Sequence, residues 1–304
     1  MPDRDLPRIT NIWSRIAGTA EGGQETQVII EADRAFPHRL ENSIPGVLLV
    51  HAQARAVMPE GTIPIRDGLL KQVTLRQCDA GTAQIVLERE RYGPYRVSTC
   101  ATLPARLILH LDRAPLKAVL AGRRVVLDPG HGGRDRGYRG PVNLWEKDVV
   151  LITAEKLAAL LTGAGAGVWP TRTDDVEADP FTRLVTARKV QADLFVSLHT
   201  GHAPTARTGG NRVLYNPASP ASITLARLVR EALQEQVSLK SKPMRPDTVY
   251  LVRLGDIPGI TVEIVTISNW VEEGLLRMPR FHEKTAFGIF NGILRWLVKE
   301  NDPG

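Results

Sequence analysis

Arg124-Val-Val-Leu-Asp-Pro-Gly-His-Gly-Gly133 is the stretch that decides the fold. Its apolar, β-branched centre predicts a buried strand, and the glycine-rich turn that follows places His131 at the carboxyl end of that strand. Helices and further strands are expected to alternate after it, at Lys147–Leu161, Leu194–Leu198, Ile223–Leu233, Ile260–Val265 and Phe281–Val298. Strands alternating with helices predict an α/β domain, a mixed sheet flanked by helices.

The residues before this stretch predict a different architecture. Short apolar segments separated by turn-forming residues lie at Thr26–Ala32, Gly46–His51, Leu69–Arg76, Thr82–Glu88 and Ala105–Leu111. Such a pattern predicts a small all-β sandwich. A two-copy repeat supports it: Gln27–Glu31 resembles Gln84–Glu88, Pro37–Leu40 resembles Pro94–Val97, and Leu48–His51 resembles Leu107–His110. We expect the copies to form the two sheets. We place the domains at 1–116 and 117–304.

Composition restricts the class of protein. The 304 residues are 43% hydrophobic and 24% charged, as expected of about two soluble globular domains. The net charge of +6 admits an anionic partner. We expect no nucleic-acid binding, because the basic residues are dispersed and the aromatic residues are few.

Membrane spans and targeting segments are not expected. The longest uncharged stretch, Leu157–Thr171, has 15 residues, too few to cross a bilayer. Residues 1–8 have no apolar core, so we expect no signal peptide in this chain.

Cys78 and Cys100 could form a disulfide or be two unpaired thiols, and the sequence leaves both open.

Three potential metal ligands lie at strand ends or beside them. His131 and His199 each follow a buried strand, and Glu146 opens a helix, so they could form a zinc site with an open fourth position. Glu263 interrupts an apolar strand, where a carboxylate is costly unless it is paired or used. Each residue alone has an ordinary alternative: a structural histidine, a first-turn carboxylate, or a solvent-facing edge residue.

Four ordered motifs carry a resemblance to a known family. They are Leu127-Asp-Pro-Gly-His-Gly-Gly133, Glu146-Lys-Asp148, Ser197-Leu-His199, and Val262-Glu263 with Ser268-Asn269. This series resembles the zinc-dependent N-acetylmuramoyl-L-alanine amidases. The resemblance implies one Zn²⁺ on His131, Glu146 and His199, and Glu263 as the catalytic carboxylate. It also implies hydrolysis of the amide between the lactyl group of N-acetylmuramic acid and L-alanine in peptidoglycan, in the periplasm or outside the cell.

Further residues follow from the same resemblance. We expect Asp128, Arg183, His202 and Asn269 to line or support the substrate groove. Thr200-Gly201 stands where Ala-Asn or Ala-Asp is common in the family, a departure that leaves the ligands intact. Only Asn216–Ser222 separate a strand from the next helix, so we expect no autoinhibitory helix.

The first domain is similar to the AMIN domain, which implies targeting to the cell wall or the division site. Two other functions stay open for the chain. One is a catalytically weak wall-binding or regulatory module on the same scaffold, and the other is a zinc peptidase that cuts within the stem peptide. The sequence does not indicate the oligomeric state.

Overall fold

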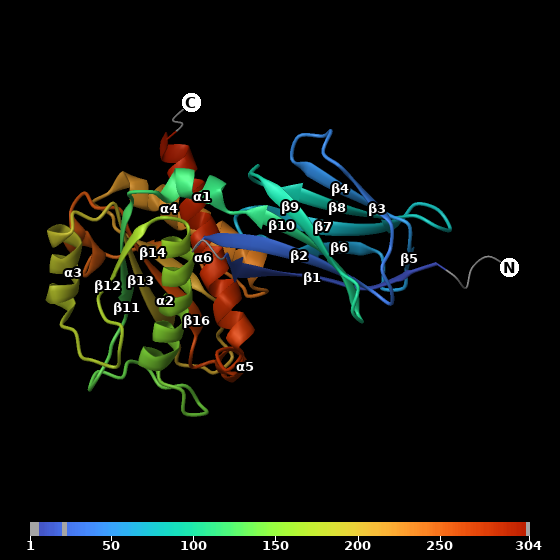
Figure 1. Ribbon diagram of the computed structural model, residues 1–304. Helices are drawn as coiled ribbons and strands as arrows, with labels where there is room; N and C mark the ends of the chain where they lie inside the picture. Colours follow the sequence, from blue (N-terminus) through green and yellow to red (C-terminus); the bar gives the residue numbers. More distant parts are fainter. Residues whose placement is uncertain (1–5, 20–22, 302–304) are drawn as a thin grey trace. The chain divides into compact units, whose positions relative to one another are not determined.

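The computed structural model describes residues 6–19 and 23–301 (Figure 1). Residues 1–5, part of the segment in which no signal peptide is expected, lie outside the described residues. The chain divides into two compact units, residues 1–118 and 119–304. Helix α1 (Ala114–Leu120) contains the boundary along the chain.

Strands fill the first unit. They are β1 (Arg8–Gly18), β2 (Gln24–Ala32), β3 (His38–Glu41), β4 (Val47–Ala52), β5 (Arg55–Ala56), β6 (Gly61–Pro64), β7 (Leu70–Gln77), β8 (Ala83–Arg89), β9 (Tyr95–Cys100) and β10 (Ala105–Asp112). Two five-stranded sheets result, in the orders β5-β1-β2-β10-β9 and β3-β4-β8-β7-β6. Alternating apolar residues of both sheets, such as Val28, Leu109, Val50 and Ile85, share one buried cluster. Cys78 and Cys100 are unpaired.

The sequence repeat does not divide into one copy per sheet. Strand β2 of the first copy pairs with β10 of the second, through Leu107 opposite Ile30. Strand β8 of the second copy pairs with β4 of the first, through Ile85 opposite Val50. The expected assignment of copies to sheets is therefore wrong, because each copy gives one strand to the sheet of the other.

The second unit is built on one mixed sheet. Its strands are β11 (Arg124–Pro129), β12 (Gly167–Pro170), β13 (Leu194–Gly201), β14 (Arg212–Tyr215), β15 (Arg245–Pro246) and β16 (Gly259–Thr266), in the order β12-β11-β13-β16-β14-β15. Strands β12, β11, β13 and β16 are parallel, and β14 runs antiparallel to β16. Its helices are α2 (Glu146–Gly163), α3 (Pro180–Lys189), α4 (Pro220–Gln236), the 3₁₀ helix η1 (Leu251–Leu254), α5 (Trp270–Leu275) and α6 (Pro279–Asn301).

The helices cover both faces of this sheet. Helix α6 packs against α2 and α4, and α3 lies on the other side of the sheet from α2 (Figure 1). Val126 and Phe195 pack with Leu184 and Leu251, which joins α3 and η1 to that face. The expected α/β layer is confirmed for this unit. No helix within 6–19 and 23–301 is long and apolar enough to cross a membrane.

Strand register determines which side chains meet. Asp128 of β11 lies opposite Ser197 of β13, and His199 of β13 lies opposite Glu263 of β16. Side chains alternate between the two faces along a strand, so residues two positions apart on one strand point to the same face. Residues paired in register on neighbouring strands also share a face. Asp128, Ser197, His199 and Glu263 therefore lie on one face, toward the carboxyl ends of parallel strands, where α/β sheets bind ligands.

Candidate metal and active site

The turn after β11 brings His131 toward His199. His131 adopts the left-handed conformation, with φ of 61°, which is uncommon for a residue with a side chain and is frequent at functional sites. Gly130 leaves room for the imidazole of His199, because a Cβ there would lie 2.3 Å from the ring. The glycine at this position therefore has a packing function beside the site.

Glu146 is held by the loops around it. Its side chain is fully buried at the first residue of α2. The backbone N–H of Thr200 donates to Oε1 over 2.7 Å, and that of Tyr138 donates to Oε2 over 2.9 Å. These bonds fix the carboxylate between the two histidines.

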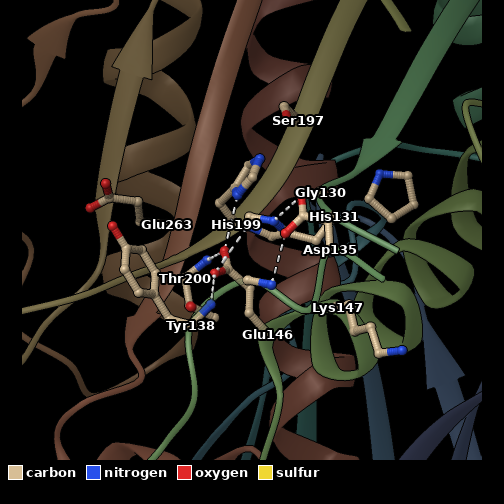
Figure 2. Close-up of polar contacts among 12 residues, drawn as sticks. Gly130, His131, Asp135, Tyr138, Glu146, Lys147, Ser197, His199, Thr200 and Glu263 are labelled. Atoms are coloured by element: carbon tan, nitrogen blue, oxygen red, sulfur yellow. Dashed lines mark hydrogen bonds and ion pairs between the residues drawn. The ribbon is translucent and has the colours of Figure 1, made fainter. Parts of the chain in front are cut away.

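His131, Glu146 and His199 form one cluster, with a ligand atom of each within 4.8 Å of the others. Glu146 Oε2 is 3.1 Å from Nε2 of His131, and Oε1 is 2.9 Å from Nδ1 of His199. Figure 2 shows the three side chains converging. Two imidazole nitrogens and one carboxylate oxygen are a donor set that zinc accepts in catalytic sites, so the residues present fit this metal.

Asp135 orients one of the histidines. Its carboxylate accepts a hydrogen bond from Nδ1 of His131 over 2.8 Å. That bond places a proton on Nδ1, so Nε2, which lies 3.1 Å from Glu146 Oε2, is the nitrogen that would bind a metal once its own proton is released. Such carboxylate–histidine pairs are the usual support of metal-binding imidazoles.

The cluster is electrostatically coupled. Burial alone would raise the pKa of Glu146, but hydrogen bonds from His131 and His199 outweigh it and hold that pKa far below its usual range. Burial opposes protonation of His131, but Glu146 and Asp135 together raise its pKa. The carboxylate is therefore charged at neutral pH, as a metal ligand must be.

Asp128 is a buried support of the site. Arg183, Thr171 and Ser197 each donate a side-chain hydrogen bond to its carboxylate over 2.7 Å, and the Tyr250 hydroxyl donates another over 3.2 Å. Burial alone would raise the pKa of Asp128, but Arg183 and the hydroxyl donors lower it. Asp128 therefore joins Arg183 of α3 and Tyr250, the residue before η1, to the end of β11.

Two arginines hold the backbone of the His131 turn. Arg183 donates to the carbonyl oxygens of Pro129 and His131, and Arg172 donates to those of Pro129 and Gly130. Each guanidinium is buried, so these bonds are shielded from water. They restrain the strained backbone that carries His131.

Glu263 lies beside the cluster and outside its three-residue ligand set. In Figure 2 its carboxylate is directed away from Glu146. Arg212 Nη1 is 3.8 Å from one carboxylate oxygen, and Arg245 Nη2 is 3.9 Å from the other. The cost of a carboxylate on this strand is thus offset by two positive charges, an arrangement that strand pattern alone did not indicate.

A cavity of about 300 Å³ opens next to the cluster. It is lined by Asp128, Gly130, His131, Asp135, Ala178, Pro180, Arg183, His199, Asp247, Tyr250 and Thr261. Two of the four expected groove residues, Asp128 and Arg183, are in this lining. The other two lie elsewhere: His202 stacks on Tyr138 with ring centroids 4.6 Å apart, and Asn269 caps α5 by accepting from Val271 N and Glu272 N.

Sequence reasoning missed three contributors. Asp135 lies four residues after His131, a spacing that could have marked it as a partner. The backbone N–H of Thr200, and not its side chain, donates to Glu146. The unusual residue type at this position therefore does not remove the hydrogen bond. Tyr250 reaches Asp128 from 122 residues away, and no local pattern indicates that contact.

The second unit is similar in sequence to proteins of a known family. Residues 125–295 match the Amidase_3 family, described as N-acetylmuramoyl-L-alanine amidase. The germination-specific N-acetylmuramoyl-L-alanine amidase of Bacillus subtilis is 30% identical over 204 residues, 62% of this chain and 86% of that protein. The probable cell wall amidase LytH of Staphylococcus epidermidis is 29% identical over 189 residues, which span 62% of this chain and only 61% of that protein.

A solved structure agrees with the fold. N-acetylmuramoyl-L-alanine amidase AmiC2 of Nostoc punctiforme superposes with a TM-score of 0.56 at 30% identity, over 59% of this chain and 99% of that chain. The catalytic domain of CwlV from Bacillus (Paenibacillus) polymyxa superposes with a TM-score of 0.55 at 28% identity, over 58% and 98%. The family match lies entirely within the second unit.

Proposed function

The chain belongs to the N-acetylmuramoyl-L-alanine amidase family and to that enzyme class, and we propose that it hydrolyses the amide between the lactyl group of N-acetylmuramic acid and L-alanine in peptidoglycan. The observation that carries the proposal is the meeting of His131, Glu146 and His199 at the carboxyl ends of parallel strands. Their donor set and the adjoining cavity supply what a hydrolytic metal site requires.

His131, Glu146 and His199 would hold one Zn²⁺, with a fourth position open. When bound, zinc polarises the scissile carbonyl and lowers the pKa of water. Asp135 keeps Nε2 of His131 free to bind, and the backbone of Thr200 orients the carboxylate of Glu146. The bonds from Arg172 and Arg183 keep the His131 turn in place while substrate enters and leaves.

Glu263 is the acid/base residue of the proposal. Its carboxylate accepts a proton from the attacking water and delivers it to the nitrogen of the leaving amine. Register supports this role, because Glu263 lies directly opposite His199 on the neighbouring strand. Adjacent strands are about 4.8 Å apart, so a substrate amide at His199 is within reach of the carboxylate.

The first unit would serve as an AMIN-like β-sandwich that directs the enzyme to the cell wall or the division site. Its two sheets share one apolar core. Because peptidoglycan lies outside the cytoplasm, the proposed enzyme would act in the periplasm or outside the cell. Only residues 216–219 separate β14 from α4, so we expect the groove to be open without an autoinhibitory helix.

Metal content and amidase rate, measured on the same preparations, test the assignment. We expect the wild type to contain one zinc and to be active, and His199→Ala to lose both. Glu263→Gln should keep zinc and lose rate by about 10²–10⁴-fold, the usual contribution of a positioned proton carrier. An unchanged rate for Glu263→Gln would contradict the mechanism.

The same assay separates the alternatives. A wall-binding or regulatory module would bind sacculi and hold zinc without releasing peptides, under conditions in which a known amidase releases them. A zinc peptidase would release fragments whose new amino terminus is an internal stem residue. Either result would contradict the amidase assignment.

A further inference from the structure

A row of polar residues crosses the sheet from the metal cluster to its edge. Glu263 of β16 lies in register with His199 of β13 on one side and with Arg212 of β14 on the other. Arg245 of β15 pairs with Leu214, two residues from Arg212. Because register partners share a face, the two arginines continue the row past Glu263 on the face that carries His199.

The arginines in this row have unused hydrogen-bonding capacity. Their ion pairs with Glu263 are 3.8 and 3.9 Å long, beyond hydrogen-bond distance. Nε of Arg212 is buried and has no hydrogen-bond partner among the described residues. Such a buried donor is costly unless something satisfies it. The side chain of Arg245 is 58% exposed and therefore accessible to a ligand.

Lys242 adds a third cation. Its ammonium donates to Oγ1 of Thr266, the last residue of β16. Burial and then the positive charge of Arg212 lower the pKa of Lys242, and the carboxylates of Glu263 and Glu272 oppose this. The carboxylate of Glu272 accepts from the backbone of Gly210 and Thr266. Among the described residues, Glu263 is the carboxylate that forms ion pairs with Arg212 and Arg245.

The opposite flank of the cluster has the reverse polarity. The cavity beside His199 contains the carboxylates of Asp135 and Asp247. Its one arginine, Arg183, is bound to Asp128 and to backbone carbonyls. A bound substrate therefore meets acidic groups on one side of the cleavage position and, on the other, basic groups that retain hydrogen-bonding capacity.

Resting on the proposed amidase function, we propose that Arg212, Arg245 and Lys242 form a carboxylate-binding subsite for the peptide side of the cleaved amide. Arg212 stands two strands from His199, roughly 10 Å at the usual strand spacing. An extended peptide covers about 3.3–3.6 Å per residue. The subsite thus selects substrates with a free carboxylate within the first two or three peptide residues, and the acidic flank receives the uncharged sugar.

Two synthetic substrates that differ in one group test the subsite. Both are N-acetylmuramoyl-L-alanine extended by D-glutamate whose γ-carboxylate is amidated; one has its α-carboxylate free, and in the other that carboxylate is amidated as well. The measured quantity is the ratio of kcat/KM for the two. We expect the wild type to favour the free carboxylate about tenfold, the scale of one charge-assisted hydrogen bond.

Variants of the exposed arginine locate the effect. Arg245→Gln should bring the ratio close to one, and Arg245→Glu should invert it. Arg227→Gln is the matched control, because it removes one positive charge from an exposed ion pair with Glu231 on α4; its ratio should equal that of the wild type. Added salt should lower the wild-type ratio, since the attraction is electrostatic.

Two results would overturn this inference: equal wild-type rates on both substrates, or a ratio that Arg245→Gln and Arg245→Glu leave unchanged. Equal, measurable rates would leave the amidase assignment intact. Cleavage of neither substrate would instead overturn the proposed function and the subsite with it.

Discussion

Gly130→Ala is a small change that should disable the proposed site by displacing His199. The added Cβ would lie 2.3 Å from the His199 ring, and ordinary contact begins at 3.4 Å. The imidazole must therefore move by about 1.1 Å, the difference between these distances. A misplacement of about 1 Å costs about 10²-fold in rate. We expect that loss in kcat/KM, together with weaker zinc binding.

Assay of rate, zinc content and unfolding distinguishes this effect from loss of the fold. Overpacking of this size costs about 1–3 kcal/mol, so the variant should remain folded by thermal denaturation. Gly274→Ala is the control, because a Cβ there meets nothing within 4 Å. Full rate and full zinc content in Gly130→Ala would refute the reasoning that Gly130 makes room for His199.

Three further variants probe the supports of the two units. Asp135→Ala should weaken zinc binding about 10–100-fold, by chelator competition, because it frees His131 to change tautomer; unchanged affinity would argue against this orienting role. Glu273→Ala should lower the urea-unfolding free energy by about 3 kcal/mol, because its buried carboxylate accepts from the backbone of Val142 and Leu144; a loss below 1 kcal/mol would contradict this. Burial alone would raise the pKa of Glu25, but its hydrogen bond with His110 helps to hold that pKa below 4.5, so the stability from this charge is present above that pH and is lost as the pH falls further. Glu25→Gln should flatten the acid limb of a pH–melting curve, and an unchanged acid limb would exclude this contribution.

The strands that sequence predicted are those with a clear apolar pattern. All five segments expected before residue 112 contain a strand, and the buried strand at 124–128 extends to Pro129 as β11. Strand β1 was missed because only Ile9 and Ile12 of its eleven residues are buried, so it has no regular alternation. Strand β1 forms because it pairs with β2 along nearly its whole length. No local sequence pattern encodes this pairing.

The meeting of His131, Glu146 and His199 was predictable because these residues lie at or beside strand ends. His131 and His199 directly follow apolar segments, and a parallel sheet brings such ends together. The contacts around this cluster were harder to predict from the sequence. Arg212 meets Glu263 because the strand that ends at Tyr215 runs antiparallel to β16, a pairing that the sequence did not indicate. The Tyr250–Asp128 contact joins distant segments. Polar contacts of this kind depend on register, which single-sequence patterns do not specify.

Mass analysis of the peptides released from purified sacculi tests the central claim most directly. The account predicts that the zinc-loaded wild type releases peptides with a free amino-terminal L-alanine and leaves glycan strands with an unsubstituted lactyl carboxylate. It also predicts that Glu263→Gln releases none above background. Fragments that begin at any other stem residue, or no release at all by the zinc-loaded wild type, would contradict the account.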